Sequence, residues 1–325
     1  MKKRILKFFK WTFIVLGVLV VVLSIVVALR QNRKFDAPFP DIHASTDSAV
    51  IARGRYLAYG PAHCSGCHLP KEKQEALRRG EEPPLVGGFV FDIPPGKFYS
   101  KNITPDKETG IGNRTDAELA RVLRHGVGHD GRSILPFMEF KNASDQDLTA
   151  MISFLRSQPP VKNKVPDHEV KFPIGHIVKA FFLSPQGPTE PIKKYVTEDT
   201  TIEYGKYLAT CIANCKGCHT NRSLMTGEYT GPDFAGGLIM ESGINPDTTL
   251  APPNLTQDPT TGRIYGWTFE TFSDRFKKGR VVNCSDMPWE QYQKMSQSDL
   301  KAIFKFLQSL PPVKNDTGPA VRKTS

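Results

Sequence analysis

Two copies of one short motif carry the chemistry that this sequence offers. Residues 64–68 read CSGCH and residues 215–219 read CKGCH, so each motif has two cysteines separated by two residues and a histidine directly after the second. Thiol and imidazole groups at this spacing can hold zinc, form a redox-active disulfide, or attach a haem through two thioether bonds. The surrounding sequence has to discriminate among these three sites.

The context argues against the first two sites. A zinc site of four cysteines needs two CxxC pairs close together, yet the motifs lie 151 residues apart. A thioredoxin-like CxxC needs an alternating strand and helix pattern, which the sequence does not show. In CxxCH, the thiols bond to the haem vinyl groups and the adjacent histidine binds the iron. We therefore predict two covalently bound haem c groups, one at Cys64, Cys67 and His68 and one at Cys215, Cys218 and His219.

The two motifs belong to an internal duplication. Three pairs of segments match: GRYLAYGPAHCSGCH (54–68) with GKYLATCIANCKGCH (205–219), NITPDKETG (102–110) with NLTQDPTTG (254–262), and DLTAMISFLRSQPPVKN (147–163) with DLKAIFKFLQSLPPVKN (299–315). A period near 150 residues is much longer than the period of solenoid or propeller repeats, so each copy is a whole domain. We expect domains at 45–160 and 200–315, a packed linker at 161–199 and a C-terminal tail at 316–325.

Helical signals dominate both copies. Thr115 to Glu118 has the form of a capping box, and the helix that it opens closes on Gly126. The last helix of each copy is expected to begin near Ser144 or Ser296 and to stop at the Pro-Pro pair that follows. No stretch shows convincing strand alternation. Both domains are therefore predicted to be mostly α-helical.

An apolar segment precedes the duplication. Residues 11–29, WTFIVLGVLVVVLSIVVAL, form 19 residues without a charge, close to the ~20 that cross a bilayer as a helix. A cleavable signal peptide is the competing interpretation, but no small-residue cleavage site follows the run. We predict an uncleaved anchor at 1–34. More positive charge lies before the span than after it, which favours a single pass through the inner membrane, a cytoplasmic N-terminus and haem domains in the periplasm.

The charge distribution argues against nucleic acid as a partner. The formal net charge is +10, but the first 34 residues hold eight lysines or arginines and no acid. The remaining 291 residues carry 35 basic and 33 acidic side chains and are close to neutral. A protein that binds nucleic acid through its folded body would need a basic surface there.

The order of the motifs resembles that of class I diheme cytochromes c. CxxCH is followed by the NITPDKETG or NLTQDPTTG loop, a methionine-bearing loop, and a last helix that runs into PPVKN. The pattern is most similar to the cytochrome subunits that serve periplasmic alcohol and gluconate dehydrogenases, and it covers nearly all of residues 45–315. The resemblance implies two tandem class I cytochrome c domains after one N-terminal transmembrane helix. Those subunits commonly carry three haems, whereas this chain has two motifs.

The resemblance also implies a methionine as the sixth iron ligand, located between the NITPD-type loop and the last helix. Met138 is the only methionine in that interval of the first copy. In the second copy Met287 and Met295 both qualify by position, and the sequence DMPWEQYQKMSQSDL resembles the family's ligand loop at Met287. We therefore expect Met138 and Met287 as ligands, with Met295 as the alternative. Methionine ligation raises the reduction potential and fills the last iron position, which suits electron transfer.

Cys211 and Cys284 remain after the four thioether cysteines are assigned. In an oxidising compartment such a pair suggests a disulfide. Two alternatives stay open: both thiols stay reduced, or Cys284, three residues before Met287, binds the second iron. Cysteine ligation of this kind occurs in sulfur-oxidising haem enzymes.

The sequence therefore predicts an electron-transfer protein and not an enzyme. It is expected to relay electrons from a periplasmic donor, such as a dehydrogenase, to a respiratory acceptor, such as a membrane oxidase. The alternative is a diheme oxidoreductase such as a peroxidase or a thiosulfate-oxidising enzyme. That class needs an open or cysteine-ligated iron, whereas this sequence offers one methionine to each haem.

Overall fold

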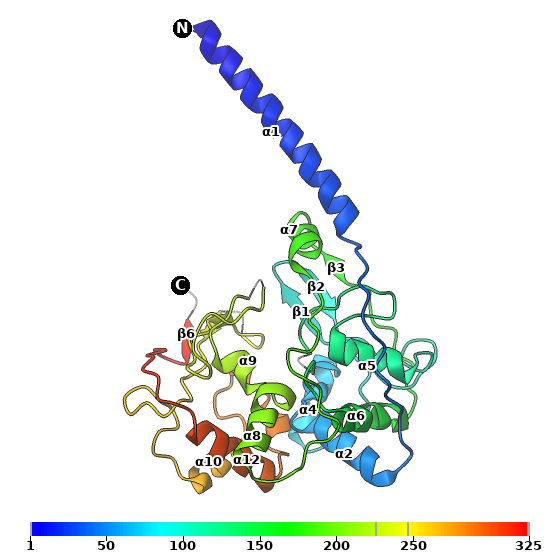
Figure 1. Cartoon of the computed structure of the whole chain (residues 1–325), viewed down its shortest axis with the longest axis vertical. Helices are drawn as coiled ribbons and strands as arrows, with labels where there is room; N and C mark the ends of the chain where they lie inside the picture. Colours follow the sequence, from blue (N-terminus) through cyan, green and yellow to red (C-terminus); the bar gives the residue numbers. More distant parts are fainter. Residues whose placement is uncertain (1, 139, 225, 246, 324–325) are drawn as a thin grey trace.

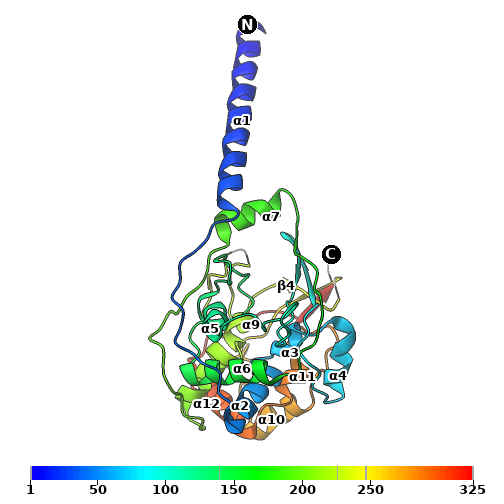
Figure 2. The ribbon, with the colours of Figure 1, turned by 90° about the vertical axis from the view of Figure 1, so that its right-hand side faces the viewer.

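The computed structural model describes residues 2–138, 140–224, 226–245 and 247–323. One long helix, α1 (Lys2–Arg30), projects as a rod from a mostly helical body (Figures 1 and 2). Its segment Lys3–Arg30 is long and apolar enough to cross a membrane, and none of its most apolar window is buried against the body. The chain then runs along the body, where Phe35 N donates to the carbonyl of Gly131 at 2.8 Å.

The two copies of the duplication, called here the first repeat (45–160) and the second repeat (200–315), are built around short helices. Those of the first repeat are α2 (Ser48–Tyr59), α3 (Cys64–Cys67), the short 3-10 turn η1 (Lys71–Lys73), α4 (Gln74–Arg78), α5 (Asp116–His125) and α6 (Asp145–Ser157). Those of the second repeat are α8 (Ile202–Tyr207), its continuation η3 (Leu208–Ile212), α9 (Cys215–His219), α10 (Phe269–Lys277), α11 (Trp289–Tyr292) and α12 (Gln297–Gln308). Between the repeats lie α7 (Ile174–Ile177) and η2 (Val178–Phe182).

The helix ends follow the capping signals of the sequence. Thr115 and Glu118 form the predicted capping box at the start of α5, and Gly126 ends that helix in the left-handed conformation, with φ of 64°. Ser144 and Ser296 are the N-caps of α6 and α12, where each hydroxyl accepts from the third backbone N–H of its helix. These helix boundaries are confirmed, because a side-chain cap acts within one turn and needs no distant partner.

The first and last helices of each repeat cross at a glycine. A Cβ on Gly54 of α2 would lie 1.9 Å from the carbonyl oxygen of Ala150 in α6, and a Cβ on Gly205 of α8 would lie 2.0 Å from that of Ala302 in α12. No side chain fits at such a distance. Glycine is therefore required at both positions for the helix pairs to approach each other.

The structure also contains short strands that the sequence pattern did not predict. Within the described residues they form two antiparallel three-stranded sheets: β1 (Val90–Ile93), β2 (Gly96–Tyr99) and β3 (Glu169–Val170), and β4 (Met240–Glu241), β5 (Thr248–Leu250) and β6 (Val321–Lys323). Strands of two to four residues are too short to show alternation. The third strand of each sheet comes from the predicted linker or tail, so both of these segments pack on the repeats.

The repeats are joined by reciprocal hydrogen bonds. Tyr56 Oη of the first repeat donates to Asp299 Oδ2 of the second at 2.5 Å, and Tyr207 Oη of the second donates to Asp147 Oδ2 of the first at 2.7 Å. The same two hydroxyls accept from the backbone N–H groups of the N-cap serines of α12 and α6, at 2.9 and 3.1 Å. Each repeat therefore completes the start of the other's last helix.

The two buried carboxylates also have partners within their own repeats. Arg53 Nε lies 3.1 Å from Asp147 Oδ1, and Tyr204 Oη donates to Asp299 Oδ1 at 3.1 Å. One hydrophobic core that contains buried residues of both repeats, including Leu148 and Leu300, surrounds this interface. The repeats therefore share one core.

Replacing Tyr207 with Phe tests the reciprocal interface. The substitution removes the donor to Asp147, and burial raises the pKa of Tyr207 well above its ordinary value, so the hydroxyl keeps its proton as a donor at any working pH. Because a hydrogen bond to a charged group contributes about 1.5–3 kcal/mol, we expect Tyr207→Phe to lower the free energy of unfolding by about that amount. Urea denaturation followed by circular dichroism measures the change.

Tyr195→Phe is the matched control for this test, because Tyr195 is 69% exposed. The control is expected to leave the urea midpoint unchanged. An unchanged midpoint for Tyr207→Phe as well would show that the tyrosine-to-aspartate bonds contribute nothing to the stability of the interface.

Candidate functional site

Each CxxCH motif lies on a single helical turn. The residue before the first cysteine, His63 or Asn214, has the left-handed backbone conformation, with φ of 41° or 47°. Asn214 supports this conformation, since its side-chain oxygen accepts from Gly217 N at 3.2 Å. The turn places the two cysteines of a motif three positions apart on one helical turn, and the histidine directly follows the second cysteine. Cysteine and histidine side chains of a motif are thus held together by local structure alone.

The two motif histidines are oriented by equivalent hydrogen bonds. His68 Nδ1 lies 2.8 Å from the carbonyl oxygen of Lys101, and His219 Nδ1 lies 2.9 Å from that of Pro253. A carbonyl oxygen can only accept, so Nδ1 carries the proton and Nε2 of the neutral ring keeps its lone pair. Burial lowers the pKa of both histidines, which favours the neutral ring. Each ring therefore presents Nε2 as a metal ligand.

Two glycines bring the accepting carbonyls close to the motifs. Gly87 N donates to the carbonyl of His68 at 2.9 Å, and Gly236 N donates to that of His219 at 2.8 Å. Both have positive φ, of 74° and 72°. A Cβ on Gly87 would lie 2.5 Å from the carbonyl carbon of Lys101. Only glycine allows the two backbone segments to meet here.

The loops that follow Lys101 and Pro253 are tied to the ends of the repeats. Asn102 Nδ2 donates to the carbonyl of Val161 at 2.8 Å, and Thr104 Oγ1 donates to Asn102 Oδ1 at 2.8 Å. Asn254, Thr256 and Val313 form the same bonds in the second repeat, at 2.8 Å each. The matched NITPD-type and PPVKN segments of the sequence therefore bond to each other, directly after the carbonyl that orients the histidine.

The donor set fits haem c better than zinc or a redox disulfide. Burial raises the pKa of Cys64 to about 12 and that of Cys67 to about 11, so both thiols stay protonated at neutral pH. Zinc ligation and thiol–disulfide exchange both need a thiolate. In the part of the chain that the structure describes, no group of three or more His, Cys, Asp or Glu side chains could hold a metal ion. Two thiols beside an imidazole with an available Nε2 are what haem c attachment requires.

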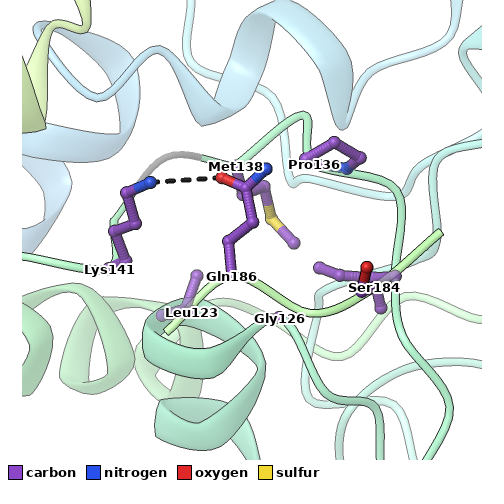
Figure 3. A pocket seen from close by; sticks show the side chains of 8 residues that line it. Leu123, Gly126, Pro136, Met138, Lys141, Ser184 and Gln186 are labelled. Atoms are coloured by element: carbon purple, nitrogen blue, oxygen red, sulfur yellow. Dashed lines mark hydrogen bonds between the residues drawn. The ribbon is translucent and has the colours of Figure 1, made fainter. Parts of the chain in front are cut away.

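Met138 lies in the loop after α5, half-buried against the shared core. Figure 3 shows its thioether among Pro136, Ser184 and Gln186, in a pocket whose rim is closed by a 3.1 Å hydrogen bond from Lys141 Nζ to Gln186 Oε1. The lining of this pocket contains no residue of the 64–68 motif. The structure thus brings Met138 to the edge of the shared core, and its role as a ligand stays a prediction.

The two candidate methionines of the second repeat differ in burial. Met295 is 5% exposed and is part of the shared core. Met287 is half-buried at the edge of that core, in a loop held by Arg280, whose Nη2 donates to the Met287 carbonyl at 3.3 Å and to Glu290 Oε2 at 2.7 Å. A buried methionine that fills the core is the ordinary case. The difference in burial favours Met287 over Met295.

Cys211 and Cys284 are not joined to each other in the structure. Cys211 is buried in η3, whereas Cys284 is half-buried in the loop that leads to Met287. The carbonyl of Cys284 accepts from Ser242 Oγ at 2.9 Å. The disulfide stays a prediction for the oxidised protein.

Tyr292 makes a contact with both motif turns that the sequence did not predict. The Tyr292 ring of α11 packs edge-on against the ring of His63, with 5.8 Å between centroids, and its hydroxyl donates to the carbonyl of Ala213 at 2.5 Å. His63 directly precedes the first motif, and Ala213 lies two residues before the second. Tyr292 therefore connects the two motif turns. No sequence signal marks this role, because it depends on the packing of one repeat against the other.

Comparison with known proteins finds cytochromes c among the similar sequences. No family model matches the chain. The chain is 32% identical over 292 residues to the cytochrome c subunit of a quinone-dependent alcohol dehydrogenase from Gluconobacter oxydans, over 85% of this chain and 58% of that protein. It is 27% identical over 279 residues to the gluconate 2-dehydrogenase cytochrome c subunit of Pantoea cypripedii, over 81% of this chain and 60% of that protein. The chain thus spans about three fifths of the length of both subunits.

A third relative is nearer to this chain in length. It is a diheme c-type cytochrome of Cereibacter sphaeroides, 26% identical over 264 residues that cover 77% of this chain and 82% of that protein. These similarities confirm the resemblance that the motifs indicated. Over most of its length the chain is therefore similar to the cytochrome c subunits of alcohol and gluconate dehydrogenases and to a diheme c-type cytochrome.

Proposed function

We propose that this chain is a membrane-tethered diheme cytochrome c that relays electrons from a periplasmic dehydrogenase, or another donor, to a membrane oxidase or other respiratory acceptor. One observation carries the proposal: two CxxCH turns, one in each repeat, present protonated thiols and an imidazole held through Nδ1 by an equivalent backbone carbonyl. Haem iron supplies one-electron transfer between its ferric and ferrous states. The dehydrogenase as donor is supported by the names of the relatives.

Each repeat would hold one haem as a class I cytochrome c domain. The residues assigned to the two haems are Cys64, Cys67, His68 and Met138 in the first repeat and Cys215, Cys218, His219 and Met287 in the second. The carbonyls of Lys101 and Pro253 orient the histidines, while the shared core behind the methionines excludes water. Coordination by both histidine and methionine suits electron transfer and opposes peroxide chemistry, because no iron position is left open. This argues against the peroxidase and thiosulfate-oxidising alternatives.

The anchor interpretation of α1 gains support from its contacts with the body. Arg30 Nε donates to the carbonyl of Ala180 at 3.2 Å, and Gln31 Oε1 lies 2.6 Å from His176 Nδ1. Contacts of this kind favour a helix that stays attached to the body. We infer that α1 stays attached in the inner membrane, with its basic end in the cytoplasm and the two repeats in the periplasm. A tether of this kind raises the effective concentration of the haem domains near a membrane partner.

Mass spectrometry tests the number of haems. After expression in a host that attaches haem c, the intact chain is expected to carry two haem-sized mass increments, because each motif supplies two thiols for thioether bonds. Cys64→Ala with Cys67→Ala should leave one increment, and Cys284→Ala, the control, should leave two. A wild-type chain with fewer than two increments would contradict the diheme assignment. Alkylation of the same sample without reduction reports whether Cys211 and Cys284 form a disulfide.

Optical spectroscopy tests the methionine ligands. A methionine bound to ferric iron gives a weak far-red band, so Met138→Ala and Met287→Ala should each remove about half of its intensity and lower one of the two reduction potentials. Met295→Leu is the control, since this buried side chain is assigned to the core. Loss of the band in Met295→Leu with retention in Met287→Ala would reverse the assignment. Turnover of hydrogen peroxide without an added dehydrogenase would support the peroxidase alternative.

A further inference from the structure

The helical segment formed by α7 and η2, residues 174–182, carries a stripe of large apolar side chains. Their spacing along the segment is that of one face of a helix. The stripe consists of Ile174, Ile177, Val178, Phe181 and Phe182. Ile174, Phe181 and Phe182 are 54%, 38% and 41% exposed. The stripe therefore lies largely on the outside of the folded chain.

The small residues of the same segment are the buried ones. Gly175 and Ala180 are buried, and a Cβ on Gly175 would lie 2.2 Å from the carbonyl oxygen of Pro95. A surface helix of a water-soluble protein normally turns its large apolar side chains toward the core. Phe172, two residues before the segment, extends the outward apolar surface and is 86% exposed. This inverted arrangement indicates a surface that is covered by something other than water.

The position of residues 174–182 beside α1 indicates that lipid covers their apolar stripe. Figures 1 and 2 show α7 at the end of the body nearest to α1, directly beside the C-terminal end of that helix. Arg30 is the first charge after the apolar run, so it marks the depth at which a spanning helix reaches the lipid headgroups. Its Nε donates to the carbonyl of Ala180 in η2, and its guanidinium lies 5.5 Å from the centre of the Phe181 ring. The apolar stripe therefore lies at the depth of the membrane interface.

We propose that residues 172–182 form a second membrane contact, in which Phe172, Ile174 and Phe182 insert between phospholipid headgroups into the edge of the acyl region. The inference rests on the proposed anchor role of α1, because the segment lies directly beside the C-terminal end of that helix. Lys171, at its edge, is paired with Asp92 at 2.8 Å. The proposed source of binding is the insertion of the apolar side chains into the acyl region.

A second contact restrains the body in a way that a single helix cannot. The bonds of Arg30 to Ala180 and of Gln31 to His176 hold the body to α1 at one edge. Insertion of residues 172–182 adds a second point of attachment to the bilayer, so the first repeat, to which β3 and α7 are joined, keeps one orientation to it. Partners within the membrane would then meet the same face of the protein in every encounter.

Photocrosslinking of the full haem-loaded chain in phospholipid vesicles tests this contact. Phe172, Ile174, Trp11 and Tyr265 are replaced one at a time by p-benzoylphenylalanine, and lipid adducts are detected by mass spectrometry after illumination. Position 11 reports the span. Position 265 is 52% exposed and lies four residues before α10, a helix that Figure 1 shows at the end of the body far from α1. We expect lipid adducts at 11, 172 and 174, with a yield at least tenfold lower at 265.

The pattern of adducts separates failure of this inference from failure of the proposed anchor. Adducts at 11 without adducts at 172 or 174 would overturn the second contact alone, as would crosslinks from 172 to a second copy of the chain in place of lipid. An absence of adducts at 11 as well would overturn the anchor together with this inference.

A charge substitution provides the matched comparison. Phe172→Asp with Phe182→Asp should lower the lipid adduct yield of the probe at 174 at least tenfold, because charged side chains do not enter the acyl region. Tyr265→Asp, the control, should leave that yield unchanged. An unchanged yield in the double variant would overturn the proposal. Circular dichroism of each variant verifies that the fold is retained, as the high exposure of Phe172 leads us to expect.

Discussion

The hydrogen bond between each motif histidine and a backbone carbonyl is the interaction on which the candidate site depends. An imidazole can serve as an iron ligand only when the correct nitrogen has the lone pair and the ring has one orientation, and the bonds of His68 to Lys101 and of His219 to Pro253 set both. Gly87 and Gly236, whose N–H groups donate to the carbonyls of His68 and His219, let the segments that carry the accepting carbonyls approach the motifs. Bonds between the NITPD-type loops and the PPVKN segments hold the residues directly after those carbonyls. Many of the sequence features that the two repeats share therefore support the hydrogen bond between the motif histidine and its backbone carbonyl.

The second constraint is the pairing of the repeats with each other. Each repeat supplies the tyrosine hydroxyl that completes the buried start of the other's last helix, and one hydrophobic core extends across both. Tyr292 then links the turn before Cys64 to the turn before Cys215. Because the last helix of a repeat also packs on the helix that leads into its motif, the interface holds the two motifs at a constant separation. A constant separation is what a relay between two redox centres requires.

Most helices could be predicted from the sequence, whereas the strands could not. Thr115, Ser144 and Ser296 act on the turn that they begin, so their effect is visible in a few consecutive residues. β3 and β6 have two or three residues each and exist because β2 and β5 offer them an edge. The domain limits predicted at 160 and 315 consequently leave out the last strand of each sheet. Residues 174–182 likewise show a helical apolar pattern, which by itself predicts a buried face, and only the packing of Gly175 and Ala180 shows that the stripe is turned outward.

The sequence by itself determined the chemistry: two CxxCH motifs, their duplication and the apolar run are local patterns whose meaning does not depend on distant residues. The tertiary structure alone decided which carbonyl orients each histidine, how the two repeats complete each other, which of Met287 and Met295 is buried in the core, and which way the stripe at 174–182 faces. The physical reason is separation along the chain. Bonds such as His68 to Lys101 or Tyr56 to Asp299 join residues that are dozens or hundreds of positions apart, and no pattern of neighbouring residues reports them.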